Sequence, residues 1–377
     1  ELSQLLAELK NIYRQCERGE FVIEDGIEDV HSQVEYLLTQ KLGPIGKKIH
    51  SGRSRNDQVL VDLKLFSRAH IKETAGKVQT LFQVLLKRSS ELQSVLMPGY
   101  THLQVAMPSS FGLWFGAYAE ALTDDMRLIA AAYEMANLNP LGSAAGYGSS
   151  APISRQTTTK LLHFADLDYN SIYSQMNRGK MEWVVSMAYS SVALTIGKWA
   201  MDCCLFNSQN FSFVSLPKNM TTGSSIMPHK KNPDVFELMR AHCNKVASTA
   251  ESIRAIISNL PSGYFRDLQL LKEVYLPLFE EVDTIIDIAA YAAEHLEVRR
   301  DIMSDKLYQP CFSVEEVNRL VSEGVPFRDA YRQVGEQIEK GEFTFKGELH
   351  HTHEGSIGNL CNDKIAEKMQ RAAAIFA

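Results

Sequence analysis

The sequence lacks several features that would place it in a particular class of protein. It contains no stretch of about 18 uncharged apolar residues, which argues against a transmembrane helix. Lys and Arg total 39 against 45 Asp and Glu, and the formal net charge of -6 offers no general attraction to nucleic acid or to an anionic membrane. Any cationic function must therefore be local.

Cysteine is scarce as well, and it shows no Cys-x-x-Cys spacing. Among the six cysteines, Cys203 and Cys204 are adjacent and lie in an apolar helical pattern. This position favours buried, reduced thiols. Reduced thiols in turn predict a cytoplasmic protein.

Patterns typical of β-strands are few, whereas long helical patterns are common. Apolar residues recur at steps of three and four over several long stretches. The predicted helices cover residues 57–96, 111–136, 181–206, 235–260 and 268–298. Pro277 should kink the last of them. Long helices with short polar connections predict an all-α fold with a long central helical bundle. Their apolar residues cover more than one face, which predicts association with other copies of the chain.

Shorter helices are predicted on both sides of this bundle. They lie near residues 2–16, 29–41, 314–322, 327–339 and 362–376. Pro310 and a capping box, Ser313-x-x-Glu316, open the C-terminal set. The chain begins with ELSQLLAELK, which is typical of the middle of an amphipathic helix, so we expect the N-terminal region to be truncated. The predicted regions are an N-terminal helical region, the bundle and a small C-terminal helical domain, at residues 1–52, 53–302 and 303–377.

Three polar stretches interrupt the helices where a bundle needs no such residues. The first is SGRSRNDQ, residues 51–58. Arg53 and Arg55 can clamp carboxylates through bidentate contacts, and Asn56 adds a neutral donor and acceptor. A solvated helix-capping loop is the alternative interpretation.

The second stretch is PGYTHLQ, residues 98–104. Its His102 lies among hydroxyl and amide side chains in a proline-glycine turn. An imidazole in such a turn can serve as a general acid or base near neutral pH. A purely structural histidine is the alternative.

The third stretch is TTGSSIMPHKKNPD, residues 221–234, directly before a predicted helix. Asn232 suits an N-cap, Pro233 suits the first helical position, and Asp234 favours the positive end of the helix dipole. Such a helix start, preceded by hydroxyl and lysine side chains, predicts an anion site.

The residues of this third stretch that can bind a carboxylate, together with the helix amides, are Ser224, Ser225, Lys230 and Asn232. A phosphate loop would need further glycines and a preceding strand, so that interpretation fails. Gly223 is instead predicted to be a hinge.

Two other polar stretches have less specific interpretations. HHTHE, residues 350–354, could bind a metal, but its spacing fits no standard zinc site. GSAAGYG, residues 142–148, lacks the βαβ surroundings of a dinucleotide motif and predicts a tight backbone loop near the substrate.

The three polar stretches, in this order, resemble those of a known enzyme family. GSSIMPHKKNP is similar to the signature loop of the fumarase/aspartase superfamily, whose members eliminate fumarate from succinyl compounds. SGRSRNDQV and MPGYTHLQ are similar to the argininosuccinate lyase/delta-crystallin branch, and the similarity spans residues 28–327. The resemblance implies an all-α fumarase/aspartase-like fold, no cofactor, no metal, and a homotetramer with composite active sites.

The resemblance also implies catalytic roles. Ser224 would remove the substrate proton. Lys230 and the helix end would stabilise the Ser224 alkoxide and the negatively charged intermediate. His102 would protonate or polarise the leaving nitrogen, and Glu237 would orient His102.

Further residues are assigned to substrate binding by the same resemblance. They are Arg53, Arg55, Asn56, Thr101, Asn232, Tyr264, Gln269, Lys272 and His31. Tyr264 and Gln269 also have a structural alternative, because they lie near a helix start.

The sequence departs from the family pattern in two places. Relatives usually carry an Asp-Arg-Asp set where this chain has Asn177, Arg178 and Gly179. We therefore expect an acidic partner for the amino-acid end of the substrate to be missing or replaced. Leu270 and Leu271 occupy positions where relatives often have acidic residues.

The implied reaction is the cleavage of argininosuccinate to arginine and fumarate, a step of arginine biosynthesis. Adenylosuccinate lyase is one alternative, since its loop also tends to contain MPHK. However, SGRSRND argues against it, and a nucleotide would need a phosphate site that we do not find. A non-enzymatic crystallin-like structural protein is the other alternative, against which the retained catalytic set argues.

Helix length gives a separate argument for assembly. Arg55 precedes the predicted helix 57–96, and His102 follows it. About 40 residues at 1.5 Å each make a rod of roughly 60 Å. One small dicarboxylate cannot touch both ends, so the two stretches are predicted to meet across different chains.

Overall fold

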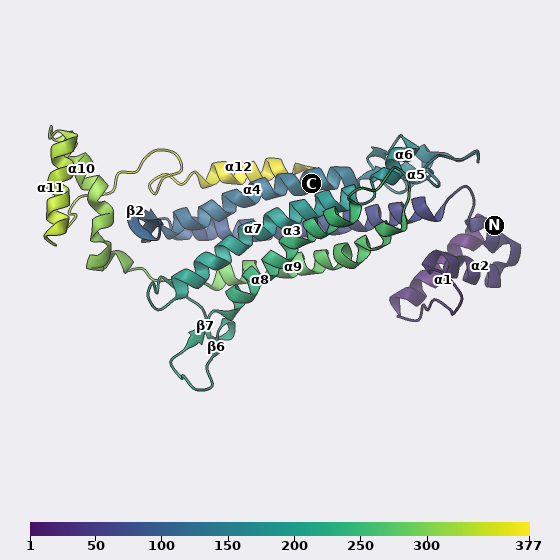
Figure 1. Ribbon diagram of the computed structural model, residues 1–377, viewed down its shortest axis with the longest axis horizontal. Coiled ribbons are helices and arrows are strands. Elements are labelled where there is room, and N and C mark those ends of the chain that lie inside the picture. Colours follow the sequence, from purple (N-terminus) through teal and green to yellow (C-terminus); the bar gives the residue numbers. More distant parts are fainter. The chain divides into compact units, whose positions relative to one another are not determined.

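The computed structural model describes residues 1–377, and helices dominate it (Figure 1). The α-helices are α1 (Leu2–Glu17), α2 (Val30–Leu42), α3 (Arg55–Glu91), α4 (Phe111–Ala136), α5 (Arg155–Leu161), α6 (Ser171–Met176), α7 (Lys180–Asn207), α8 (Asp234–Ile257), α9 (Leu271–His295), α10 (Ser313–Ser322), α11 (Phe327–Glu339) and α12 (Asn362–Ala373). The predicted all-α class is confirmed. None of these helices combines the length and apolarity that a bilayer crossing needs.

Strands are short and occur only in pairs. They are β1 (Leu96–Thr101), β2 (Gln104–Ser110), β3 (Leu138–Asn139), β4 (Asp166–Leu167), β5 (Val214–Ser215), β6 (Thr222–Gly223), β7 (Lys231–Asn232) and β8 (Glu297–Val298). The pairs β1–β2, β5–β8 and β6–β7 are antiparallel, and β3–β4 is parallel. Short 3₁₀ helices complete the chain: η1 (Gly43–Ile49), η2 (Lys218–Met220), η3 (Arg266–Gln269), η4 (Ile302–Ser304), η5 (Lys306–Phe312) and η6 (Ala374–Phe376).

The chain folds into two compact units, each assembled from segments that are distant in sequence. The first unit consists of Glu1–Arg68, Met135–Lys180 and Ile257–Leu268. Within it, α1 and α2 pack around a small apolar cluster that includes Ile12 and Leu38. This unit carries the arginine stretch at the start of α3.

The second unit consists of Ala69–Glu134, Met181–Ile256 and Gln269–Ala377. Its long helices pack through aromatic side chains. The ring of Tyr189 on α7 meets Phe279 on α9 edge-on, with centroids 5.3 Å apart, and Trp199 on α7 meets Phe236 on α8 at 5.4 Å. Such edge-to-face pairs favour one relative orientation of the helices.

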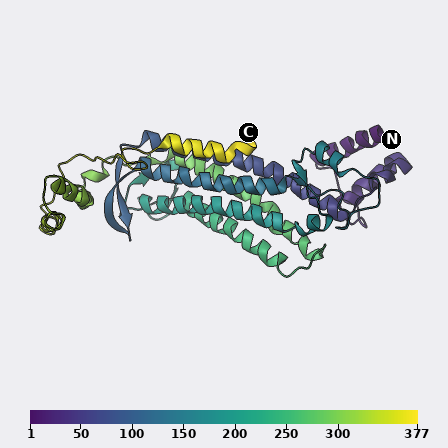
Figure 2. The same cartoon turned by 90° about the horizontal axis from the view of Figure 1, so that it is seen from above.

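The C-terminal helix α12 lies along α4 within the second unit (Figure 1 and Figure 2). Lys368 of α12 forms an ion pair with Glu120 of α4, and the rings of Tyr133 and Phe376 are 5.1 Å apart. The preceding helices α10 and α11 have their own apolar cluster, which Val105 of β2 also contacts.

Helix boundaries follow the sequence pattern to within a few residues, with corrections. The first bundle helix covers Arg55–Glu91 and not residues 57–96, because Ser54 and Asp57 start it two residues earlier and β1 begins at Leu96. The last bundle helix covers Leu271–His295 and not residues 268–298, and Pro277 lies inside it.

Two predicted caps are also corrected. Ser313 is the first residue of α10 and caps nothing, because η5 runs directly into α10 and leaves no isolated helix start. Asn232 pairs with Thr222 in the β6–β7 hairpin, so α8 begins at Asp234.

Candidate active site

The arginine stretch lies in the first unit, where Arg55 is the first residue of α3. Its guanidinium lies 3.1 Å from Asp29 Oδ2 and donates hydrogen bonds to Ser32 Oγ and Gln58 Oε1, both at 3.1 Å. Arg53 instead donates to the backbone carbonyl of Ile49. Asn56 is half-buried on the first turn of the helix.

Asp29 and His31 at the start of α2 face this same stretch. Asp29 caps α2 by accepting a hydrogen bond from the Ser32 amide at 2.8 Å. Burial alone would raise the pKa of Asp29, but the hydrogen bonds from Ser32 and the charge of Arg55 lower it below its ordinary value. His31 Nε2 lies 3.2 Å from Asp62 Oδ2 on α3. The structure therefore places Asp29, which sequence reasoning missed, against Arg55, and it places His31 against Asp62 further along α3.

His102 occupies the tip of the β1–β2 hairpin in the second unit. Thr101 pairs with Gln104, so His102 and Leu103 alone form the turn, with φ of 55° and 56°. Positive φ at both central residues is what a tight two-residue hairpin requires, although side chains with a Cβ disfavour it. All four residues of this turn are exposed, and Leu103 is 71% exposed.

The hairpin is anchored behind its tip by aromatic packing. The Tyr100 ring lies 5.5 Å from Phe211 and 6.4 Å from Phe213. A cavity of about 630 Å³ beside the hairpin is lined by Tyr100, Phe211 and Trp114, and the Trp114 indole donates a hydrogen bond to Asp202 at 3.0 Å. The base of the hairpin is thus fixed while its tip presents His102 to solvent.

The signature loop forms a second hairpin, β6–β7, which projects away from the helices (Figure 1). Ser224 follows β6 directly, and its Oγ accepts hydrogen bonds from the amides of Ile226 at 3.3 Å and Met227 at 3.1 Å. Amide donors directed at this oxygen favour its ionised form, which a serine base needs. Sequence reasoning did not foresee these two donors.

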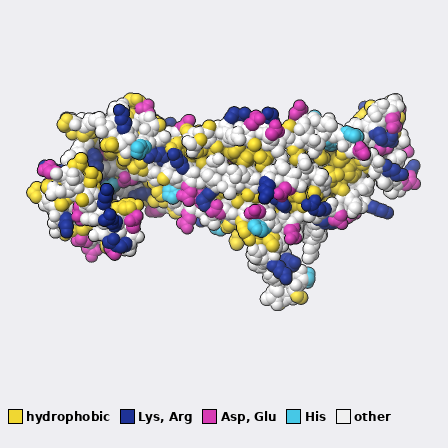
Figure 3. All heavy atoms as spheres, turned by 180° about the vertical axis from the view of Figure 1, so that it is seen from behind, with side chains coloured by type: hydrophobic (Ala, Val, Ile, Leu, Met, Phe, Trp, Pro, Cys, Tyr) yellow, Lys and Arg dark blue, Asp and Glu magenta, His cyan; other side chains and the backbone are white.

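Lys230 and Lys231 on this loop are exposed, and the space-filling view shows Lys and Arg side chains gathered on the projecting loop (Figure 3). At the base of the loop, Thr222 Oγ1 donates to Asp234, and Asn232 donates to Thr222 at 3.4 Å. The loop is therefore cationic toward its tip and tied at its base.

Glu237 lies exposed on the first turn of α8. No hydrogen bond joins Glu237 to His102 within the chain, and none joins Ser224 to Lys230. The predicted roles of these four residues remain predictions, because the single chain does not assemble them around one point.

Tyr264 and Gln269 lie between α8 and α9, and Lys272 lies in the first turn of α9. The guanidinium of Arg178 lies 5.5 Å from the centre of the Tyr264 ring and donates to the Leu268 carbonyl at 3.2 Å. Gln269 ends η3, and Lys272 is exposed on the first turn of α9.

The departure at residues 177–179 has a backbone explanation. Asn177 is the C-cap of α6, and Gly179 takes a φ of +86° just before α7 begins. An aspartate at position 179 would be strained in this conformation. The glycine that replaces the acidic residue at position 179 therefore suits the tight connection between α6 and α7.

Comparison with solved structures identifies the class of enzyme whose fold this chain shares. An EDDS lyase in complex with formate matches with a TM-score of 0.85 at 19% sequence identity, over 99% of this chain and 82% of that one. A fumarate lyase:delta crystallin from Brucella melitensis matches with a TM-score of 0.75 at 17% identity, over 99% and 83%. The fold is that of the fumarate lyases.

Sequence relatives narrow the class. A model of a lyase family matches residues 1–248. The argininosuccinate lyase of Phocaeicola vulgatus is 64% identical over 100% of this chain and 84% of its own length, and that of Bacteroides fragilis is 63% identical over the same shares. The argininosuccinate lyase of Thermotoga neapolitana is 38% identical over 87% of this chain and 83% of its own length. The chain belongs to this lyase family, on its argininosuccinate lyase branch.

Proposed function

We propose that the protein cleaves argininosuccinate to arginine and fumarate. The observation that carries this proposal is high identity to argininosuccinate lyases along the whole chain, with the three polar stretches intact. Adenylosuccinate, the alternative substrate, is not favoured, because the sequence relatives described above are argininosuccinate lyases. The non-enzymatic alternative is not favoured either, because the full set of reactive side chains is present.

The reaction is a β-elimination. Ser224, as an alkoxide, takes the proton from the carbon next to a carboxylate, and the electrons of that C–H bond become the C=C bond of fumarate. The neighbouring C–N bond breaks, and the guanidino nitrogen of arginine takes a proton from His102. Lys230 and the start of α8 offset the additional negative charge on the carboxylate of the intermediate.

The substrate-binding roles follow from the family resemblance and from the charge and hydrogen-bonding capacity of the side chains. Arg55 and Asn56 at the start of α3 bind a carboxylate, with Arg53 beside them. Thr101 next to His102 and Asn232 at the base of the signature loop supply further hydrogen bonds. Tyr264, Gln269, Lys272 and His31 complete the proposed substrate contacts.

Helix length supports a composite site. α3 is continuous over 37 residues, which corresponds to about 55 Å. Arg55 begins this helix, whereas His102 lies on the hairpin that follows its end. One small substrate cannot span that length, so each site takes these residues from different copies. We accordingly propose a homotetramer, in which His102 of one copy meets Glu237 of another.

Exposed apolar side chains on the bundle support this assembly. Met187, Leu194 and Met201 recur every seven residues along α7 and are 45%, 62% and 49% exposed. Such a spacing keeps one seam of a helix facing a neighbouring helix. The space-filling view shows hydrophobic side chains spread along the helical body (Figure 3).

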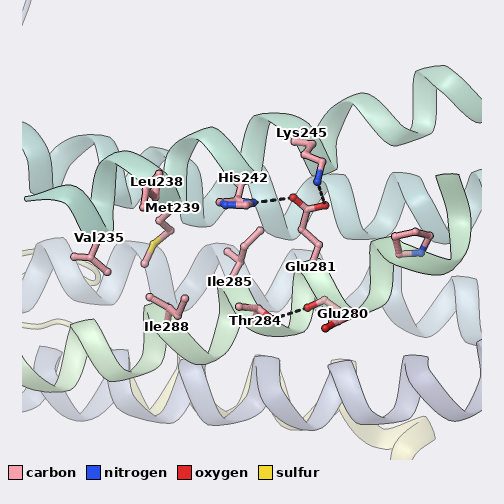
Figure 4. Close-up of a pocket in the computed structure, with 11 residues that line it drawn as sticks. Val235, Leu238, Met239, His242, Lys245, Glu280, Glu281, Thr284, Ile285 and Ile288 are labelled. Atoms are coloured by element: carbon pink, nitrogen blue, oxygen red, sulfur yellow. Dashed lines mark hydrogen bonds and ion pairs between the residues drawn. The ribbon is translucent and has the colours of Figure 1, made fainter. Parts of the chain in front are cut away.

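A groove between α8 and α9 offers a second apolar surface. Its volume is about 430 Å³, and Figure 4 shows Leu238 on α8 and Ile285 and Ile288 on α9 lining it. Glu281 bridges the groove, with one oxygen 2.8 Å from His242 Nδ1 and the other 2.8 Å from Lys245 Nζ. This paired cluster within an apolar surface is suited to fixing the register of a second copy.

A cytoplasmic location is part of the same proposal. All six cysteines are free thiols in the structure, as a reducing compartment would keep them.

The activity is tested by fumarate release, followed by its ultraviolet absorbance, with argininosuccinate and adenylosuccinate offered separately. We expect release from argininosuccinate alone. Ser224→Ala should abolish turnover while substrate still binds. Release from neither substrate would refute the proposed activity, and an active Ser224→Ala variant would remove that hydroxyl from the mechanism.

The composite site is tested by complementation. Arg55→Ala and His102→Asn should each be inactive alone. Denatured together, mixed in equal amounts and refolded, they should recover activity in roughly a quarter of the sites of a symmetric tetramer. Confirmed mixed tetramers without activity would mean that each site is built within one chain.

A further inference from the structure

The carboxylate of Asp57, in the first turn of α3, accepts three hydrogen bonds. It is completely buried and accepts hydrogen bonds from backbone N–H groups alone. Its Oδ1 accepts from Ser54 at 2.9 Å, and its Oδ2 accepts from Gly142 and Ala144, each at 2.9 Å. Hydrogen bonds to an ionised acceptor are stronger than neutral ones, so this carboxylate holds its three donors firmly.

Capping of α3 explains only half of this arrangement. A capping box needs one oxygen, which returns to the backbone N–H of the cap residue, here Ser54. The other oxygen of Asp57 turns to a loop 85 residues further along the chain. Burying a carboxylate is costly unless both of its oxygens are hydrogen-bonded, and capping alone would not require that burial. The second oxygen therefore serves the loop.

The loop in question is GSAAGYG, residues 142–148, and it is built to hold one shape. Gly142 has a φ of +88°, which directs its N–H toward Asp57 at no steric cost. Gln175 supports the loop from the other side by donating to the Ala144 carbonyl at 3.2 Å. A Cβ on Gly146 would come within 2.8 Å of the Gln175 side chain, so the loop lies directly against it.

We propose that Asp57 is a positioning residue that holds Arg55 and Asn56 in fixed register with the backbone of residues 142–148. The two segments then meet the substrate as one preorganised surface, which requires no rearrangement on binding. This inference rests on the proposed function, because it gives Arg55 and Asn56 their substrate-binding role. Asp57 itself touches no substrate.

Asp57→Asn tests the proposal with almost no change of shape. One of the two oxygens becomes an amide nitrogen that cannot accept, so at least one backbone N–H loses its partner. Hydrogen exchange followed by mass spectrometry should show the amides of residues 141–146 or of Ser54 exchanging about tenfold faster or more. This readout does not depend on activity, so it tests the connection even if wild-type protein releases no fumarate.

Kinetics then separate positioning from general stability. We expect Asp57→Asn to lower kcat/KM about 10- to 100-fold at a temperature where the protein stays folded. Because Asp57 acts through Arg55 and Asn56, adding Asp57→Asn to an Arg55→Lys variant, which keeps the charge but loses the bidentate contact, should cost less than Asp57→Asn costs the wild type. A merely structural role predicts losses that multiply, and that result would overturn the proposal.

Asp125→Asn is the matched control. Asp125 is also buried, and each of its oxygens accepts a hydrogen bond, from the hydroxyls of Ser191 and Thr195, but none of these residues has a proposed role in the site. Its kcat/KM should stay within about twofold of wild type, as expected for a change far from the chemistry. An equal loss in both variants would show a general effect of removing a buried carboxylate and would overturn the proposal.

Should Asp57→Asn fail to fold, Gln175→Met loosens the same loop from its other side while filling similar space. We expect faster exchange at residues 142–148 and a fall in kcat/KM in the same direction. Faster exchange with unchanged kcat/KM would show that the shape of the loop does not matter to the substrate, and the positioning role would be wrong.

Discussion

Replacing Lys64 by methionine should lower the free energy of unfolding by about 3–5 kcal/mol. Lys64 lies on α3 in the first unit, where its Nζ is 2.6 Å from Asp168 Oδ2 and donates to the Leu138 carbonyl at 2.9 Å. The side chains are 1% and 0% exposed. The pair thus ties the helix that begins with Arg55 to the chain at β3 and just after β4.

The magnitude follows from burial. Removing only the lysine leaves the Asp168 carboxylate in a dry site without its cation, and a lone buried charge costs several kcal/mol. For a chain of 377 residues the entropy of unfolding is about 0.8 kcal/mol per degree, so we expect a fall in Tm of about 4–6 °C. Lys64→Met combined with Asp168→Asn should recover most of the loss, because no uncompensated charge remains.

The exposed ion pair of the second unit is the control. Lys77 and Asp287 have side chains that are 25% and 59% exposed, so Lys77→Met should cost at most about 1 kcal/mol. Urea and thermal unfolding, monitored by circular dichroism at one protein concentration, measure all four proteins. Equal losses for Lys64→Met and Lys77→Met, or no recovery in the double variant, would refute the argument from burial.

Three further outcomes are expected. His102→Asn should keep the fold and lower kcat roughly 10²–10⁴-fold, the usual range for a general acid or base, and a loss under tenfold would remove that role. Asp29→Asn keeps the helix cap but loses the charge facing Arg55, so at pH 7 it should unfold about 0.5–1 kcal/mol more easily. Because folding lowers the pKa of Asp29 below 3.8, that difference should shrink as the pH falls through the lowered pKa; a difference that persists in acid would contradict the ion pair. Gly179→Asp should lower the free energy of unfolding by about 1–2 kcal/mol in urea titrations, owing to strain at positive φ, and an unchanged midpoint would undo our account of that departure.

Helix periodicity predicted most of the fold, because the positions that alternate between core and solvent are local in sequence. The helix predicted at residues 111–136 is observed as Phe111–Ala136, and the others end within a few residues of their predicted bounds. The β1–β2 hairpin was missed for a physical reason. Its turn positions hold His102 and Leu103 in place of the Asn and Gly that usually mark such a turn.

The sequence predicted only those residues of the candidate site whose side-chain type and polar surroundings indicate a reactive or binding role. Arg55 and His102 could be selected from the sequence as reactive groups in polar stretches. Asp57 belongs to the same stretch, yet its connection to Gly142 depends on contacts 85 residues apart, which no local pattern contains. Asp29 was missed in the same way, since its pairing with Arg55 requires the start of α2 to meet the start of α3, which are distant in sequence.

The left-handed turn at His102 and Leu103 has a consequence for laboratory evolution of this protein. A library varied at these two positions and selected only for heat resistance should drift toward Asn-Gly, because that pair adopts the turn without strain. Selection for growth without added arginine should instead retain histidine at position 102 and release only position 103. The two selections would therefore diverge at neighbouring residues, and the frequency of histidine among survivors would report which property each selection had rewarded.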